Sequence, residues 1–151
     1  QLGFQIFVVL MILPHIVTQY TLPHDATGIK NKLLKNYTMI ISGIMTGLTI
    51  ILSPILIPII FPKYIEAIEV IQIMGVALVP SALTLILTSE LLGKENSKSV
   101  ILGVIIAIVT LVIGIIILGQ NFGIVGLALS LVIARILQCS TLLILKNKMT
   151  T

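Results

Sequence analysis

Arg135 is the residue in this sequence whose type and position together suggest binding chemistry. It lies twelve residues after Gly123 and eleven before Lys146, in a long stretch without any other charge. In a membrane helix its guanidinium would lie about 16–18 Å from either end, where an arginine costs at least ~2.5–3.5 kcal/mol. A guanidinium holds phosphate through two parallel hydrogen bonds. Arg135 is therefore the predicted substrate-binding residue, for an anionic head group.

Two structural roles remain open for Arg135. In the first, Arg135 bonds to helix carbonyls or to Glu90. In the second, the helix is shorter and shifted, and the Arg135 side chain extends to the membrane surface. No Asp or Glu lies deep in the apolar stretches, which disfavours a proton relay or a cation site, since these use buried carboxylates.

The other reactive residue types form no catalytic set. Cys139 is the single cysteine, which excludes an internal disulfide and a cysteine-based metal site. His15 and His24 are nine residues apart, a spacing that does not place them on one helix face. No Ser/His/Asp set, HExxH motif or glycine-rich phosphate loop occurs. We therefore expect no enzyme activity, no catalytic residue, no metal and no cofactor.

Composition indicates that most of this chain is solvated by lipid. Of 151 residues, 58% are hydrophobic and 9% are charged, and the mean hydropathy is +1.23. A soluble domain carries about 25% charged residues, so a soluble globular enzyme is excluded, and a disordered chain would be rich in charge. The net charge of +4 is spread over short clusters with 5% aromatic residues. A nucleic-acid partner is not expected, because such proteins present a coherent basic face.

The charged residues separate stretches long enough to cross a bilayer, which takes ~20 apolar residues. The uncharged stretch 99–134 would form a straight helix about 54 Å long, longer than the ~30 Å hydrocarbon core. We therefore expect a turn at 119–123, where glycines flank Gln-Asn-Phe. The predicted fold is an all-α, polytopic membrane helix bundle. It is one transmembrane domain over residues 1–151 with about five spans: 2–20, 37–60, 70–90, 99–118 and 124–145.

Lysines lie almost entirely on one side of this topology. The loop 25–36 is a basic amphipathic segment expected on the membrane surface. In this topology, the lysines on the same side of the membrane as this loop are Lys30, Lys32, Lys35, Lys94, Lys98, Lys146 and Lys148. The other side holds only Lys63. Basic residues favour the cytoplasmic side, so we predict a multi-pass protein of the cytoplasmic membrane with a cytoplasmic C-terminus, and a surface role for Lys30, Lys32 and Lys35.

Small residues and prolines mark where the helices are expected to pack and bend. The Gly43–Gly47 pair is a GxxxG motif, and two further stripes comprise Gly103 with Ala107 and Gly126 with Ser130 and Ala134. Such stripes let helix backbones approach closely. Pro54, Pro58 and Pro80 are expected to bend the second and third spans, as in transporters with broken helices.

Three stretches resemble the polysaccharide and oligosaccharide-lipid flippase family of the multidrug/oligosaccharidyl-lipid/polysaccharide exporter superfamily. Residues 61–76 are similar to its Phe-Gly-x-x-Tyr-x-x-Ala segment, with Pro62 in place of the usual glycine. Residues 90–98 resemble its short loop with Gly and Lys, and residues 119–134 resemble its Gly-x-x-Gly-Ala-Ala hairpin before the last helix.

The resemblance implies the C-terminal part, roughly the last five of twelve helices, of a two-lobe transporter. It implies translocation of a polyprenyl-diphosphate-linked oligosaccharide by alternating access, in polysaccharide biosynthesis. The implied partners are the lipid bilayer, the lipid-linked glycan and the missing N-terminal helices of the same protein. Two alternatives stay open: a drug/cation antiporter of the same superfamily, and a non-transporting membrane scaffold subunit.

Overall fold

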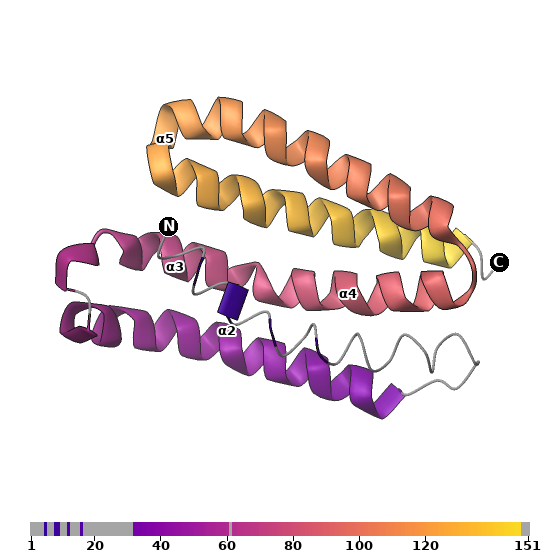
Figure 1. Cartoon of the computed structure of the whole chain (residues 1–151), viewed down its shortest axis with the longest axis horizontal. Coiled ribbons are helices and arrows are strands. Elements are labelled where there is room, and N and C mark those ends of the chain that lie inside the picture. Colours follow the sequence, from indigo (N-terminus) through magenta and orange to yellow (C-terminus); the bar gives the residue numbers. More distant parts are fainter. Residues whose placement is uncertain are drawn as a thin grey trace.

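The computed structural model describes residues 32–60 and 62–148, and five isolated positions near the N-terminus (5, 8, 9, 12 and 16). Most of the predicted span 2–20 and most of the predicted surface segment 25–36 lie outside the described residues. From residue 32 onward the described elements are all helical: α2 (Lys32–Ile60), η1 (Pro62–Tyr64), α3 (Ala67–Val76), α4 (Leu78–Gly93) and α5 (Ser97–Lys148). They lie side by side along one long axis (Figure 1).

Three helices in the described residues are long and apolar enough to cross a membrane: Lys35–Ile59, Ala67–Gly93 and Ser97–Lys148. They indicate a multi-pass membrane protein. The predicted number of five spans is wrong for the described residues. Most of the first predicted span lies outside them, and the spans predicted at 99–118 and 124–145 fall on the two sides of Gly123 within the long element α5.

α5 folds back on itself at Gly123 (Figure 1). This glycine has φ 56° and ψ −129°, a backbone conformation that side chains with a Cβ rarely adopt. The turn expected at 119–123 is therefore present, but it needs one residue rather than a loop. We call residues 97–122 the first arm of α5 and residues 124–148 its second arm.

Close contacts between the two arms show that they are antiparallel along their length. A Cβ added to Gly126 would overlap the Leu118 carbonyl, and one added to Gly114 would lie 2.8 Å from the Ser130 side chain. Near the far end, a Cβ on Gly103 would lie 2.7 Å from Leu142. The stripes at Gly126 and Gly103 predicted from sequence thus lie where the arms meet.

The predicted GxxxG pair does not make such a contact. No described atom lies within 4 Å of a Cβ built on Gly43 or Gly47. Both glycines therefore lie on a face of α2 that no described helix approaches closely.

α3 and α4 lie one after the other along the same line, and both run parallel to the second arm of α5. Near the Gly123 end, Met74 and Leu78 pack with Ala128 and Val132 in one buried cluster. Toward the other end, Leu87 and Leu91 pack with Cys139 and Leu142 in a second cluster. In each cluster, residues of α3 or α4 pack against residues of the second arm of α5, and residue numbers increase in the same direction along both segments. This fixes the register of the helices.

α2 crosses against α3 at a contact that the GxxxG motif did not predict. The Thr46 hydroxyl donates to the Gly75 carbonyl at 3.1 Å, and a Cβ on Gly75 would lie 2.9 Å from the Thr49 methyl group. Glycine at position 75 thus sets the close approach between the two helices. α2 continues through Pro54 and Pro58 to its end at Ile60.

A tight corner joins α4 to α5. Asn96 N–H donates to the Leu91 carbonyl and Glu95 N–H to the Leu92 carbonyl, both at 2.9 Å, with Glu95 at φ 59°. This is the Schellman pattern of a helix end, in which the left-handed residue is usually glycine. The Asn96 side chain then accepts the Ser99 N–H at 3.3 Å, so the same short corner begins α5.

Candidate functional site

The buried stripe of the second arm of α5 contains one charged residue. Ala128, Val132, Cys139 and Leu142 recur at helical spacing and are 3%, 8%, 6% and 0% exposed. Arg135 occupies the position of the same stripe between Val132 and Cys139. It therefore lies between the two apolar clusters and interrupts a core that would otherwise be continuous along α3, α4 and α5.

Two buried hydroxyl residues of α4 lie at the same level. Ser81 and Thr84 lie between Leu78, which belongs to the first cluster, and Leu87, which belongs to the second. Their hydroxyl oxygens are buried without a nitrogen or oxygen partner in the described part of the chain, and the Thr84 hydroxyl instead bonds to the Cys139 thiol. Together with Arg135 and the 6%-exposed Gln138, they form a set that we call the Arg135 layer.

Within the Arg135 layer, the Arg135 guanidinium donates to the Gln138 side-chain carbonyl at 3.0 Å. Both residues belong to the second arm of α5, three positions apart. Arg135 is partly buried, and no carboxylate pairs with it among residues 32–60 and 62–148. A guanidinium has five N–H donors, so the bond to Gln138 leaves donors that an anion can use.

Glu90 connects three helices at one end of the bundle. Its carboxylate accepts from Lys35 Nζ of α2 at 3.1 Å and from Lys146 Nζ of α5 at 2.5 Å. The Lys35 side chain is 11% exposed, so this pair is well shielded from solvent. Glu90 is thus bonded to lysines, which removes Glu90 as a structural partner of Arg135 and leaves the other structural roles open.

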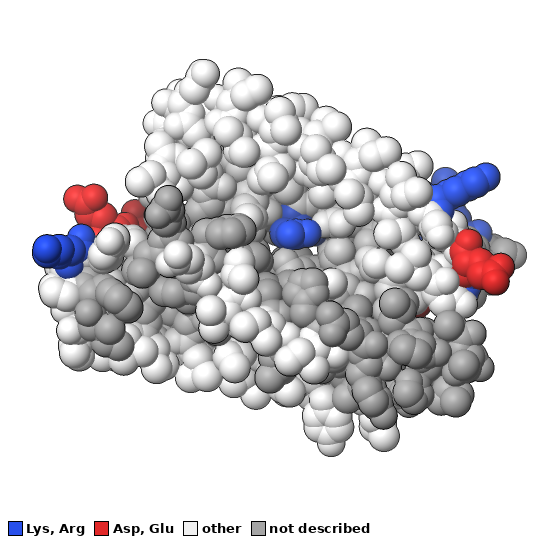
Figure 2. Space-filling model, viewed as in Figure 1, with Lys and Arg blue, Asp and Glu red and all other residues white. Residues whose placement is uncertain are grey.

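Charge is concentrated at the two ends of the bundle (Figure 2). We call the end with Lys35, Glu90, Lys94, Lys98, Lys146 and Lys148 the Glu90 end; the opposite end carries Lys63, Glu66 and Glu69. The long face between them in Figure 2 is almost free of charge, with basic atoms visible at one place midway. The lysines grouped on one side by the sequence thus lie at one end wherever the structure describes them.

The predicted membrane-surface residues are only partly covered by the structure. Lys30 lies outside the described residues, and Lys32 begins α2 without a described side chain. Lys35 is described, and it is directed to Glu90 within the bundle. A role for Lys30, Lys32 and Lys35 at the membrane surface stays a prediction.

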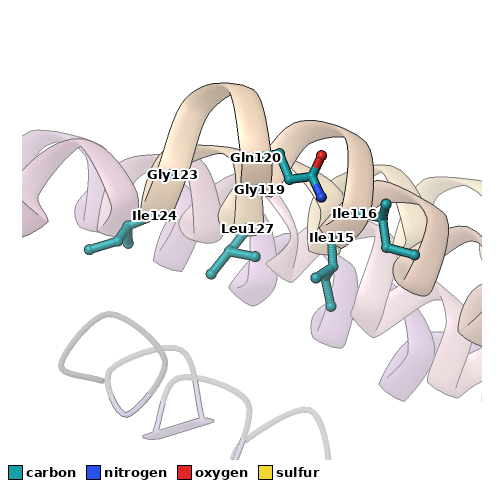
Figure 3. A pocket seen from close by; sticks show the side chains of 7 residues that line it. All are labelled: Ile115, Ile116, Gly119, Gln120, Gly123, Ile124 and Leu127. Atoms are coloured by element: carbon teal, nitrogen blue, oxygen red, sulfur yellow. The ribbon is translucent and has the colours of Figure 1, made fainter.

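An open hollow of about 540 Å³ lies at the turn of α5 (Figure 3). Its lining is formed by Ile115, Ile116, Gly119, Gln120, Gly123, Ile124 and Leu127. Gln120 supplies the one polar side chain of this lining, and no charged group lines it. The hollow therefore offers apolar contact but no partner for an anion, and it is separate from the Arg135 layer.

Sequence reasoning missed the neighbours of Arg135 and the partners of Glu90. Gln138 had a detectable signal, because a polar residue three positions after a buried arginine lies on the same helix face. Ser81 and Thr84 had no such signal, since single hydroxyl residues occur throughout membrane helices.

Compared with known proteins, the chain matches no family model, no curated protein and no solved structure.

Proposed function

We propose that this chain is part of a transporter that moves a polyprenyl-diphosphate-linked oligosaccharide from the cytoplasmic to the outer leaflet by alternating access. The observation that carries the proposal is the position of Arg135, halfway between two apolar clusters and without a carboxylate partner among the described residues. The resemblance to polysaccharide flippases supplies the class of substrate.

The chemistry of Arg135 favours an anionic substrate. Insertion of a mid-membrane arginine costs at least ~2.5–3.5 kcal/mol, and one bond to Gln138 offsets part of that cost. A diphosphate offers the bidentate acceptor geometry that a guanidinium prefers. The buried Ser81 hydroxyl, at the same level, adds a neutral donor that suits a phosphate oxygen.

The distribution of acidic residues disfavours the cation antiporter. The described glutamates are Glu66, Glu69, Glu90 and Glu95, and all lie at the ends of the bundle. A cation pathway uses carboxylates at membrane depth. The scaffold alternative assigns Arg135 a packing role only, and it makes a different prediction for transport.

A flipping assay on the full-length protein in proteoliposomes tests the proposal. The probe is a fluorescent polyprenyl-diphosphate glycan, and the variants are Arg135→Ala, Arg135→Lys and, as a control at the bundle end, Lys63→Gln. We expect at least about tenfold lower flux for Arg135→Ala, corresponding to the ~1.5–3 kcal/mol of a charged hydrogen bond. Arg135→Lys retains part of the flux because it keeps the charge but loses the bidentate geometry.

Each other outcome favours a named alternative. Unchanged flux in Arg135→Ala at normal expression removes Arg135 from the substrate site. Absence of flux in the wild type favours the scaffold, and proton-driven drug efflux favours the antiporter.

The orientation follows from the charge of the two ends. We assign the Glu90 end, with the C-terminus of α5, to the cytoplasm, because lysines are retained on that side. Single cysteines at Lys94 and Lys63, in a Cys139→Ser background, should label from opposite sides of the cytoplasmic membrane. Labelling of the Lys94 position from outside would reverse the assignment.

A further inference from the structure

The Glu90 end carries more positive charge than its acidic residues neutralise. The lysines of this end whose side chains the structure describes are Lys35, Lys94, Lys98, Lys146 and Lys148, and the glutamates are Glu90 and Glu95. Five lysines against two glutamates leave a net charge of +3. Glu90 is already occupied by Lys35 and Lys146, whereas the exposed lysines are Lys94, Lys98 and Lys148.

These exposed lysines continue directly into exposed apolar surface. On the second arm of α5, Lys148 lies one helical turn beyond Ile144, which is 59% exposed. On the first arm, Lys98 precedes Ile101 and Ile105 on the same helix face, and these two isoleucines are 58% and 53% exposed. The most apolar window of α5 is only 6% buried. Each arm thus presents a cation immediately above a strip of hydrocarbon-facing side chains.

A ligand that matches both features has an anionic head and apolar tails. We propose that the Glu90 end binds an acidic glycerophospholipid of the surrounding leaflet. Its phosphate group lies against Lys94, Lys98 and Lys148, and its acyl chains lie along the outer faces of α5. The Lys35–Glu90–Lys146 bonds hold the ends of α2, α4 and α5 together beneath this lipid. The site is separate from Arg135 and does not depend on the transported substrate.

Lipid selectivity of the full-length protein tests the site. The protein is reconstituted in phosphatidylcholine nanodiscs that contain spin-labelled phosphatidylglycerol or, in a parallel sample, spin-labelled phosphatidylcholine. The motionally restricted fraction in the electron paramagnetic resonance spectrum reports association at the protein surface. The test variant carries Lys94→Gln, Lys98→Gln and Lys148→Gln, and Lys63→Gln is the matched control at the other end.

We expect the wild type to prefer phosphatidylglycerol by at least about fivefold, the factor for ~1 kcal/mol per surface lysine. The preference should fall to near unity in the triple variant and in 1 M salt, where the screening length is about 3 Å. Lys63→Gln should keep it. An equal preference in wild type and triple variant, or a loss in Lys63→Gln alone, would overturn the proposal. Displacement of the labelled lipid by the water-soluble head group alone would overturn the role of the acyl chains.

Discussion

The side-chain amide of Gln72 on α3 donates to the main-chain carbonyl of Ile50 on α2 at 2.9 Å. Ile50 is four residues before Pro54, which has no N–H to offer that carbonyl. In lipid, a carbonyl without a donor costs several kcal/mol, so membrane helices that contain proline recruit side chains from neighbours. Gln72 therefore replaces the bond that Pro54 removes, and α2 remains helical through the proline.

This relationship predicts a coupled pair of substitutions. Gln72→Leu should lower the free energy of unfolding by about 0.6–2 kcal/mol, the range for side-chain hydrogen bonds in membranes. In a Pro54→Ala background the same substitution should cost less, because the alanine supplies the N–H that proline lacks. The measurement is a double-mutant cycle from detergent unfolding of the full-length protein. Equal costs in the two backgrounds would contradict the replacement.

Gly123→Ala should destabilise the turn of α5 through backbone strain alone, because no described atom lies within 4 Å of a Cβ at this position. Its φ of 56° and ψ of −129° strain any residue with a Cβ, at about 1–3 kcal/mol, so Gly123→Ala should destabilise the hairpin by that amount. Gly47→Ala is the control, because its helix position has no described atom within 4 Å of a new Cβ, and it should be neutral or slightly stabilising. Thermal unfolding of the two variants compares them, and a neutral Gly123→Ala would contradict the turn.

Glu90→Gln should destabilise the protein more than either Lys35→Gln or Lys146→Gln. The loss of Glu90 removes the carboxylate from two ion pairs at once, whereas the loss of one lysine leaves Glu90 paired with the other. We expect about 1–3 kcal/mol for Glu90→Gln, the cost of breaking hydrogen bonds to a shielded polar group. Glu66→Gln, at an exposed position of the opposite end, should stay within about 0.5 kcal/mol. The same unfolding assay ranks these variants, and a lysine variant worse than Glu90→Gln would refute the shared bond.

Arg135→Leu should separate stability from transport. Leucine at this position would join the two apolar clusters, so the free energy of unfolding should be unchanged or higher, as when buried charges are replaced by packed apolar groups. Flux should be lost, because the substitution removes the proposed anion-binding group. Unfolding and flipping assays on the same preparation measure both quantities. A strongly destabilised Arg135→Leu with normal residual flux would make Arg135 a structural residue.

The turn in α5 was predictable from the length of the uncharged stretch and from its glycines. Residues 99–134 exceed the thickness of a bilayer, and glycines lie where the chain must reverse. The shortness of the turn was not predictable, since the two arms meet at the single non-helical residue Gly123. Arg135 was conspicuous because no other charge lies near it in the sequence.

The contacts between helices were harder to foresee. Gly43 and Gly47 form a better motif than Gly75, yet Gly75 makes the close approach to Thr49. A glycine pair permits backbones to approach, but the rotation of each helix decides whether they do. The same rotation brings Lys35 to Glu90, a pairing for which shared membrane side was the only signal.

Glu90 also limits how this part of the molecule can move. Its two lysines come from opposite flanks of α4, one on α2 and one on the second arm of α5. Separation of α2 from α5 at that end would break an ion pair that is shielded from solvent, which is energetically costly. The two ion pairs of Glu90 therefore oppose separation of α2, α4 and α5 at that end of the bundle.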